Sequence, residues 1–253
     1  MSVMSHTVLL ETTIAPLFFS KPIVKYGIIV LKLKGDNMKI IISPAKTISK
    51  KIDRINDKEN FTSKTYEILE RLPQVRLSDD LYQAFYMYDG LCFKNINRED
   101  LDSEDLDYID KHLFILSALY GAVRPFDLIS PYRLDFLMKT EMGNLYKFWQ
   151  DEIAKKVLED EDLIVNLASD EFSKTIKKYI KDEKILNIEF FENVDGNLKK
   201  HSTISKKARG KMLYFMAKNK IEKIEDLKKI DLGGYSFSEE KSTDKKYVFI
   251  AKK

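Results

Sequence analysis

The stretch from Leu116 to Phe136, LSALYGAVRPFDLISPYRLDF, combines charged side chains with a backbone of restricted shape. A proline disfavours the helical region for the residue before it, so we expect Arg124 and Ser130 to be extended. Arg124 and Arg133 are then carried on stiff, non-helical backbone, where a planar guanidinium suits a phosphate or a carboxylate. The alternative is a buried structural corner in which these arginines pair with neighbouring aspartates.

Polar residues also follow two segments that read as buried strands, one beginning at Met38 and one spanning Asp162–Leu167. Open α/β sheets bind ligands at the carboxyl ends of their strands, which makes Lys46 a candidate anion binder and Ser169 a candidate helix cap. The candidate pocket residues are Ser43, Lys46, Tyr120, Arg124, Arg133, Asp135, Asn166 and Ser169. They indicate a phosphorylated or carboxylated small substrate, but no motif among them specifies a nucleophile, a general base or a metal.

The second candidate site is a run of basic residues. Six basic residues and no acidic ones occur from Lys199 to Lys211, whereas Glu99 to Asp110 holds seven acidic residues and no basic ones. A helix expected from Ser205 to about Lys220 carries Lys206, Lys207, Arg209 and Lys211 near its start. Positive charge is unfavourable at that end of a helix dipole, so an anionic partner explains it better than solubility does. The acidic run reads as the solvated face of a helix.

Two further features bear on this basic run. Only seven of the 43 basic residues are arginines, so a lysine is weak evidence of function and Arg124, Arg133 and Arg209 rank above any single lysine. A short helix expected at Ile224–Ile230 precedes Gly233-Gly234, an order typical of a helix-hairpin-helix element. In such an element the backbone amides of the glycine turn hold DNA phosphate, although no clear second long helix follows Gly234.

The bulk properties exclude several classes of protein. With 253 residues and 44% hydrophobic content, and without a linker or repeat, the chain suits one domain with a sizeable core. The single cysteine, Cys92, excludes an intrachain disulfide and fits a reducing cytoplasm. The three histidines lie far apart, so we expect neither a metal site nor a cofactor. No apolar run approaches the ~20 residues that a membrane span needs. The net charge of +3 does not by itself imply nucleic-acid binding.

Residues 1–37 read as an N-terminal extension to a domain of residues 38–253. The sequence Lys34-Gly35-Asp36-Asn37 is what a purine-rich ribosome-binding site would encode if translated, so we interpret Met38 as the initiator. The alternative is an added pair of strands with its turn at Gly35-Asp36-Asn37.

The periodicity predicts a mixed α/β (α+β) fold in which a mixed central sheet is flanked by helices. We expect helices at Phe61–Leu72, Leu81–Tyr88, Ser103–His112, Asn144–Glu159 and Glu171–Ile180. We expect further strands at Lys184–Glu192, Leu198–Ile204 and Tyr247–Ala251, and an extended segment at Tyr132–Phe136.

Six blocks of this sequence resemble the YaaA family of bacterial peroxide-stress proteins: MKIIISPAKT, LSALYGAVRPFDLISPYRLDF, NLYKFW, LIVNLASDEF, SKKARGKM and LGGYSF. The resemblance runs from Met38 to near the C-terminus. It implies a cytoplasmic protein that limits damage from hydrogen peroxide and intracellular free iron. It also implies DNA binding through a basic cleft with a helix-hairpin-helix-like element. It brings no catalytic residue or cofactor, and the compact region from Thr47 to Leu101 departs from the family pattern.

We therefore expect a stress protein that holds DNA phosphates without reading sequence, through Lys206, Lys207, Arg209, Lys211, Gly233 and Gly234. The alternative is an enzyme of unknown reaction that acts on a small anionic substrate in a pocket lined by Lys46, Arg124 and Arg133. Direct ligation of iron is disfavoured, because one cysteine and separated histidines do not make a soft or an imidazole site.

Overall fold

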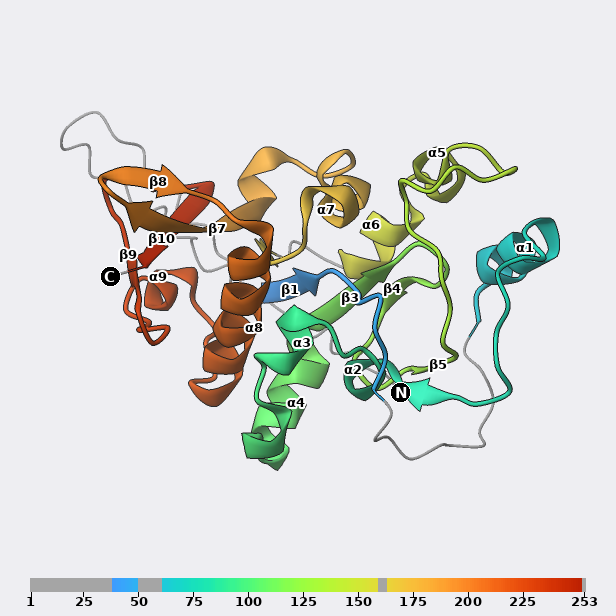
Figure 1. Cartoon of the computed structure of the whole chain (residues 1–253), viewed down its shortest axis with the longest axis horizontal. Helices are drawn as coiled ribbons and strands as arrows, with labels where there is room; N and C mark the ends of the chain where they lie inside the picture. Colours follow the sequence, from blue (N-terminus) through green and yellow to red (C-terminus); the bar gives the residue numbers. More distant parts are fainter. Residues whose placement is uncertain (1–37, 50–60, 159–162, 252–253) are drawn as a thin grey trace, which may run out of the picture. The chain divides into compact units, whose positions relative to one another are not determined.

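The computed structural model describes residues 38–49, 61–158 and 163–251 (Figure 1), so the expectations for residues 1–37 lie outside the described residues. Its main sheet has the order β4-β3-β1-β6-β7-β10-β9, with β8 paired to β7. The parallel strands are β1 (Met38–Ile42), β3 (Leu113–Ser117), β6 (Leu163–Asn166), β7 (Ile185–Val194) and β10 (Lys246–Ala251). The antiparallel strands are β4 (Gly121–Val123), β8 (Asn197–Lys199) and β9 (Tyr235–Phe237). The predicted mixed α/β fold is confirmed.

Helices cover both faces of this sheet, which explains the continuous apolar run of β1, where Ile40, Ile41 and Ile42 are fully buried. The longer helices are α1 (Ser63–Arg71), α4 (Ser103–His112), α7 (Asp170–Lys177) and α8 (Ser202–Lys218). The shorter ones are α2 (Ala84–Met87), α3 (Leu91–Lys94), α5 (Leu145–Trp149), α6 (Glu152–Val157) and α9 (Ile224–Leu227), with 3₁₀ turns at Arg98–Asp100 and Asp182–Lys184. Figure 1 shows α4 and α7 on opposite sides of β1 and β3. Within the described ranges, no helix has the length and apolar character to cross a membrane.

The connections that follow the neighbouring strands β1 and β6 lead toward opposite edges of the sheet. The next strand of this sheet after β1 is β3, which lies beside β1 away from β6. After β6 the chain passes through α7 to β7, which lies beside β6 away from β1. The loops that leave such a pair of strands diverge at their carboxyl ends and open a crevice, where ligands of open α/β sheets bind. The fold therefore offers a binding place beyond Ile42 and Asn166.

Two predicted helices have a different structure. The segment Leu81–Tyr88 begins as a short strand, β2 (Tyr82–Gln83), which pairs with β5 (Leu128–Ile129) before the single turn of α2. The amide of Phe85 then donates to the carbonyl of Pro125 at 2.7 Å. Backbone pairing with this distant segment has overridden the local helical pattern.

The predicted helix Asn144–Glu159 is broken at Gln150, which takes a left-handed φ of 50° between α5 and α6. The break lets the indole of Trp149 donate to the carbonyl of Ala118 at 2.8 Å. Residues 132–136 do not form a strand, yet Leu134 and Phe136 are buried while Arg133 is exposed, as alternation predicted. The helix α1 is capped by Thr62, whose side-chain oxygen accepts a hydrogen bond from the amide of Thr65 at 3.2 Å.

The basic helix α8 begins at Ser202, three residues earlier than predicted. Its candidate DNA-binding residues therefore lie in the second and third turns, and the argument from an unfavourable dipole is weaker than the sequence suggested. The chain beyond α8 runs through α9 and Gly233-Gly234 into the strand β9, which the sequence pattern did not reveal.

Candidate functional site

A cavity of about 580 Å³ lies at the carboxyl ends of β1 and β6, where the connections of the sheet reverse. The loop after β1 contributes residues 43–47, and the loop after β6 with the first turn of α7 contributes residues 167 and 169–172. Residues 90–93 of α3 and its N-terminal turn form another wall, and Asp135, Lys206 and Arg209 complete the lining. Segments far apart in the sequence thus meet at the sheet edge where open α/β sheets generally bind ligands.

Two serines join the loops that follow β1 and β6. The amide of Ser169 donates to the hydroxyl oxygen of Ser43 at 2.8 Å, and the Ser43 hydroxyl donates to that of Ser169 at 3.1 Å. Ser169 occupies the predicted N-cap position of α7, but its side chain does not cap the helix. In the described chain, the amides of Asp170 and Glu171 make no hydrogen bond, and both residues line the cavity.

The carboxylates around the cavity are engaged by other groups. Asp135 pairs with Lys46 at 3.2 Å and with Arg133 at 3.3 Å. Glu171 accepts a hydrogen bond from the amide of Leu137 at 3.2 Å. The side chain of Asp170 is 97% exposed and pairs with Lys177 at 3.7 Å. Asp135 therefore offsets the charge of Lys46, and Asp170 acts on Arg209 without forming an ion pair with it. The lining cations that have no ion pair among the described residues are Lys206 and Arg209.

Arg209 is the most unusual residue of the site. Its Nε is buried without a hydrogen-bond partner, and no ion pair to Arg209 occurs among the described residues. Burial lowers the pKa of its guanidinium, although acidic groups nearby oppose this, and the group remains charged at neutral pH. The side chain also borders a second cavity of about 200 Å³, lined by Asn166, Asn187 and Lys246 among other polar residues.

Arg209 is positioned by close packing of α8 against α3. A Cβ added to Gly210 would lie 2.0 Å from the carbonyl oxygen of Cys92, so only glycine allows the two helices to approach this closely. The walls that carry Leu91 and Cys92 on one side and Arg209 on the other are thereby held at a fixed separation.

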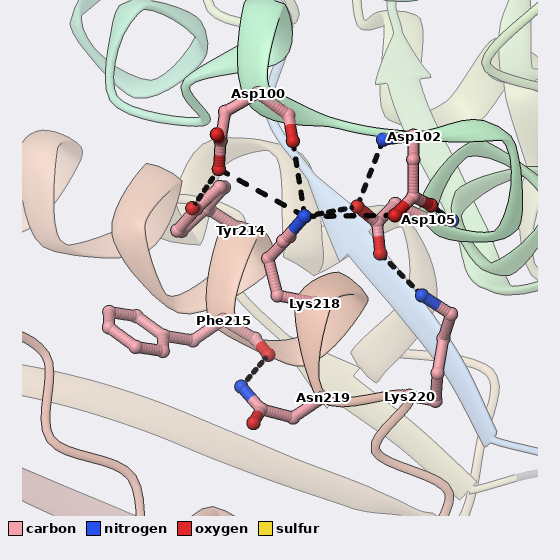
Figure 2. A network of polar contacts seen from close by, with 8 residues as sticks. All are labelled: Asp100, Asp102, Asp105, Tyr214, Phe215, Lys218, Asn219 and Lys220. Atoms are coloured by element: carbon pink, nitrogen blue, oxygen red, sulfur yellow. Dashed lines mark hydrogen bonds and ion pairs between the residues drawn. The ribbon is translucent and has the colours of Figure 1, made fainter.

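The other end of α8 is held by a network of charges (Figure 2). The carboxylate of Asp105 is 1% exposed and accepts hydrogen bonds from Lys218 at 2.8 Å and from Lys220. Lys218 also donates to the carbonyl of Asp100 at 3.1 Å, and Tyr214 donates to the Asp100 carboxylate. The network fastens α8 to α4, so the helix that carries Arg209 has little freedom to shift.

The structure brings together only part of the predicted pocket. Ser43, Lys46, Asp135 and Ser169 line the cavity, Arg133 reaches it through Asp135, and Lys206 and Arg209 join them from the predicted DNA-binding set. Asn166 lines the smaller cavity, where its amide donates to Asn187 at 2.8 Å. Tyr120 and Arg124 lie elsewhere: the Tyr120 hydroxyl donates to the carbonyl of Ser130 at 3.1 Å, and Arg124 donates to the carbonyl of Asp110.

The stretch 116–136 therefore combines both interpretations that its sequence allowed. Its first half is a structural corner, in which Arg124 pairs with Asp110 at 3.5 Å and lies over the ring of Phe114. Its second half places Asp135 in the cavity wall, where Arg133 pairs with it from outside the lining. The wall formed by α3 was missed by sequence reasoning, which predicted no element between the helices expected at Leu81–Tyr88 and Ser103–His112.

The cavity wall includes the single cysteine of the chain. Burial raises the pKa of the Cys92 thiol to about 12, and the positive charge of Arg209 offsets only part of this effect. The thiolate is the form that reacts with peroxide and with alkylating agents, and at neutral pH Cys92 is almost entirely protonated. The arrangement does not make Cys92 a peroxide-reducing thiol.

We expect iodoacetamide to modify Cys92 in the folded protein at least about tenfold more slowly than in the same protein unfolded in urea. Mass spectrometry of timed samples at pH 8 measures both rates. Reaction in the folded protein as fast as in the unfolded control would show that Cys92 has an accessible thiolate.

A metal centre of protein side chains finds no support in the described ranges, where no group of three or more histidine, cysteine, aspartate or glutamate residues is arranged to hold an ion.

Comparison with known proteins agrees with the resemblance found in the sequence. The family described as "Peroxide stress protein YaaA" matches residues 67–241. A UPF0246 protein of Finegoldia magna is 40% identical over 243 residues, which cover 84% of this chain and 98% of the relative. A UPF0246 protein of Agathobacter rectalis is 36% identical over 247 residues, covering 85% of this chain and 99% of the relative. The chain belongs to the YaaA family of peroxide stress proteins.

Proposed function

We propose that this protein acts in the cytoplasm during peroxide stress by binding DNA, largely independently of sequence, through the cations of α8. Damage linked to intracellular free iron is then limited indirectly, because bound DNA is shielded where the iron would react. Membership of the YaaA family supports the link to peroxide stress.

The observation that carries this proposal is a contrast along α8. Lys206, Lys207, Arg209 and Lys211 form no ion pair with any described residue, whereas Lys218 is paired with Asp105 at 2.8 Å. Lys206 and Lys207 are also exposed. Cations without an ion-pair partner in the first half of a helix are available to phosphates, and such contacts position a duplex without reading its bases.

The glycine turn has a smaller share in the proposal. The amide of Gly233 already donates to the carboxylate of Asp231 at 3.0 Å, and the strand β9 follows Gly234. The left-handed φ values of 62° and 112° at these two glycines do give a tight turn between α9 and β9. For this turn to bind phosphate as a helix-hairpin-helix element does, the Gly233 amide must give up its hydrogen bond to Asp231 and donate to a DNA phosphate instead.

We expect Lys206→Ala, Lys207→Ala and Arg209→Ala combined to weaken DNA binding at low salt by about ten- to a hundredfold, because a protein that neutralises fewer phosphates releases fewer counterions. Fluorescence anisotropy with duplex, single-stranded and bulged DNA at two salt concentrations measures the affinities. The wild-type affinity should fall steeply with salt.

The matched control replaces three exposed lysines elsewhere, Lys139, Lys155 and Lys156, by alanine, which removes the same net charge. This variant should bind DNA nearly as the wild type does. Equal affinity of the α8 variant, or no binding by the wild type at low salt, would rule out the proposed function.

A second candidate function is the binding or conversion of a small anionic molecule in the cavity. It is favoured by the convergence there of Ser43, Lys46, Asp135 and Ser169 with Lys206 and Arg209. Arg124 has no part in it. The lining shows no nucleophile beside a general base, so the chemistry that the geometry supports is recognition.

A further inference from the structure

The size and composition of the cavity at the switch point define what can fill it. A volume of about 580 Å³ is within the usual range for small-molecule sites, and it is far larger than a phosphate ion needs. One part of the wall is apolar and comprises Ala45, Leu91, Phe93 and Phe172. A ligand that fills this space must therefore combine an apolar body with polar groups.

The polar part of the wall contains several donors that have no partner among the described residues. Arg209 and Lys206 have no ion pair within the described chain, and Arg209 carries a buried Nε–H without an acceptor. The free amides of Asp170 and Glu171 belong to the first turn of α7, where the helix dipole favours negative charge. A buried donor is normally satisfied, so the Nε–H of Arg209, together with the exposed Lys206 that also lines the cavity, favours an anion with several oxygen atoms.

The remaining polar groups suit a sugar. The hydroxyls of Ser43 and Ser169 lie at the junction of the two loops, and the carboxylate of Asp135 stands at the wall with Lys46. Hydroxyls and a carboxylate accept hydrogen bonds from sugar hydroxyl groups. A carboxylated apolar molecule would use the cations but would offer no hydroxyl groups to Ser43, Ser169 and Asp135.

We propose that this cavity binds a nucleoside monophosphate, an inference that rests on the second candidate function above and specifies its ligand. The phosphate lies among Arg209, Lys206 and the first turn of α7. The sugar lies toward Ser43 and Asp135, and the base packs against the apolar wall. Lys207, which does not line the cavity, takes no part in holding this ligand.

Isothermal titration calorimetry at low salt tests the proposal with AMP, ribose 5-phosphate, adenosine and inorganic phosphate. We expect AMP to bind with a stoichiometry of one to one. Each of the other three probes should bind at least tenfold more weakly, because ribose 5-phosphate lacks the base, adenosine lacks the phosphate, and inorganic phosphate lacks the sugar and the base. Arg209→Met should weaken AMP binding at least tenfold. The matched variant Lys207→Met, which changes a residue of the same helix outside the lining, should alter it less than twofold.

Thermal unfolding without ligand shows whether the Arg209→Met variant is folded, and we expect a midpoint equal to or above that of the wild type, because an unpaired buried charge is removed. If that variant does not fold, Lys206→Met replaces it, since Lys206 is exposed and its replacement should weaken AMP binding at least threefold.

Three results would overturn the proposal in different ways. If ribose 5-phosphate binds as tightly as AMP and depends equally on Arg209, the cavity is a small-anion site and the base contributes nothing. That result would rule out a nucleotide as the specific ligand. If adenosine binds as tightly as AMP, the phosphate contributes nothing to the affinity, and the proposed phosphate contacts are wrong. Failure of all four probes to bind would remove both the ligand and the second candidate function, while DNA binding that still depends on Lys207 would stand.

Discussion

Gly210→Ala should destabilise the protein by about 3 kcal/mol, although alanine is the better helix former. At an open position within a helix, this exchange stabilises by roughly 0.5–1 kcal/mol. Here the new Cβ would lie 2.0 Å from the carbonyl oxygen of Cys92 and 3.0 Å from the Cβ of Asn95. The first of these atoms belongs to the backbone, which cannot rotate away, so α3 and α8 must separate.

Urea unfolding followed by circular dichroism measures the change in the free energy of unfolding. The control is Thr203→Ala, an exposed position in the same helix, which we expect to be nearly neutral. A Gly210→Ala variant as stable as the wild type, or more stable, would show that the two helices do not approach as closely as described.

The same substitution should also disturb the cavity. Leu91, Cys92 and Phe93 come from the α3 wall and Arg209 from α8, so separation of the two helices moves one wall against the other. We expect Gly210→Ala to weaken binding of the proposed ligand, a nucleoside monophosphate, even where the protein remains folded. Gly210 is thus a positioning residue for Arg209.

The part of the site that the sequence predicted is the part formed by strand ends. The apolar run of β1 and that of β6 identify buried strands, and parallel strands bring Ser43, Lys46 and Ser169 to one edge of the sheet. No knowledge of helix packing is needed for this step. The wall from α3 could not be predicted in this way, because its position depends on the contact of Gly210 with Cys92, residues far apart in the sequence.

The scarcity of arginine was an incomplete guide to function. It ranked Arg124, Arg133 and Arg209 together, and Arg133 and Arg209 do lie at or beside the cavity. Arg124 instead holds the end of α4 through Asp110 and packs over Phe114. A planar guanidinium that binds a ligand equally well binds a backbone carbonyl and a neighbouring carboxylate, and composition alone does not distinguish these uses.

The prediction made for the acidic run, Glu99 to Asp110, is also only partly correct. Reading it as a solvated helical face fits Glu104 and Asp107, which are exposed, but it is wrong for Asp105, which is buried. Asp105 completes a capping box with Asp102 and meets Lys218 and Lys220 from the end of α8. The role of Asp105 depends on Lys218 and Lys220, which lie 113 and 115 residues away in the sequence. No local sequence pattern reveals this contact.

Asp105→Asn should therefore cost about 2–3 kcal/mol of unfolding free energy at neutral pH, since it removes the charge that two lysines share. The cost stays below that of a fully buried pair because Lys218 and Lys220 remain 31% and 37% exposed and regain water. Asp107→Asn, an exposed change on the same helix, is the matched control and should be nearly neutral.

Acid should reduce the difference between wild type and Asp105→Asn. Burial alone would raise the pKa of Asp105, but hydrogen bonds from Lys218, Lys220 and the amide of Asp102 outweigh it and hold that pKa well below its ordinary value. A carboxyl group with a depressed pKa stabilises the fold above its unfolded-state pKa, about 3.9, and this contribution is lost as the pH falls toward the folded-state pKa. Urea unfolding at pH 7, 5 and 3 should thus show equal gaps at pH 7 and 5 and a smaller gap at pH 3. A gap that does not shrink at pH 3 would mean that the charge of Asp105 is not what fastens α4 to α8.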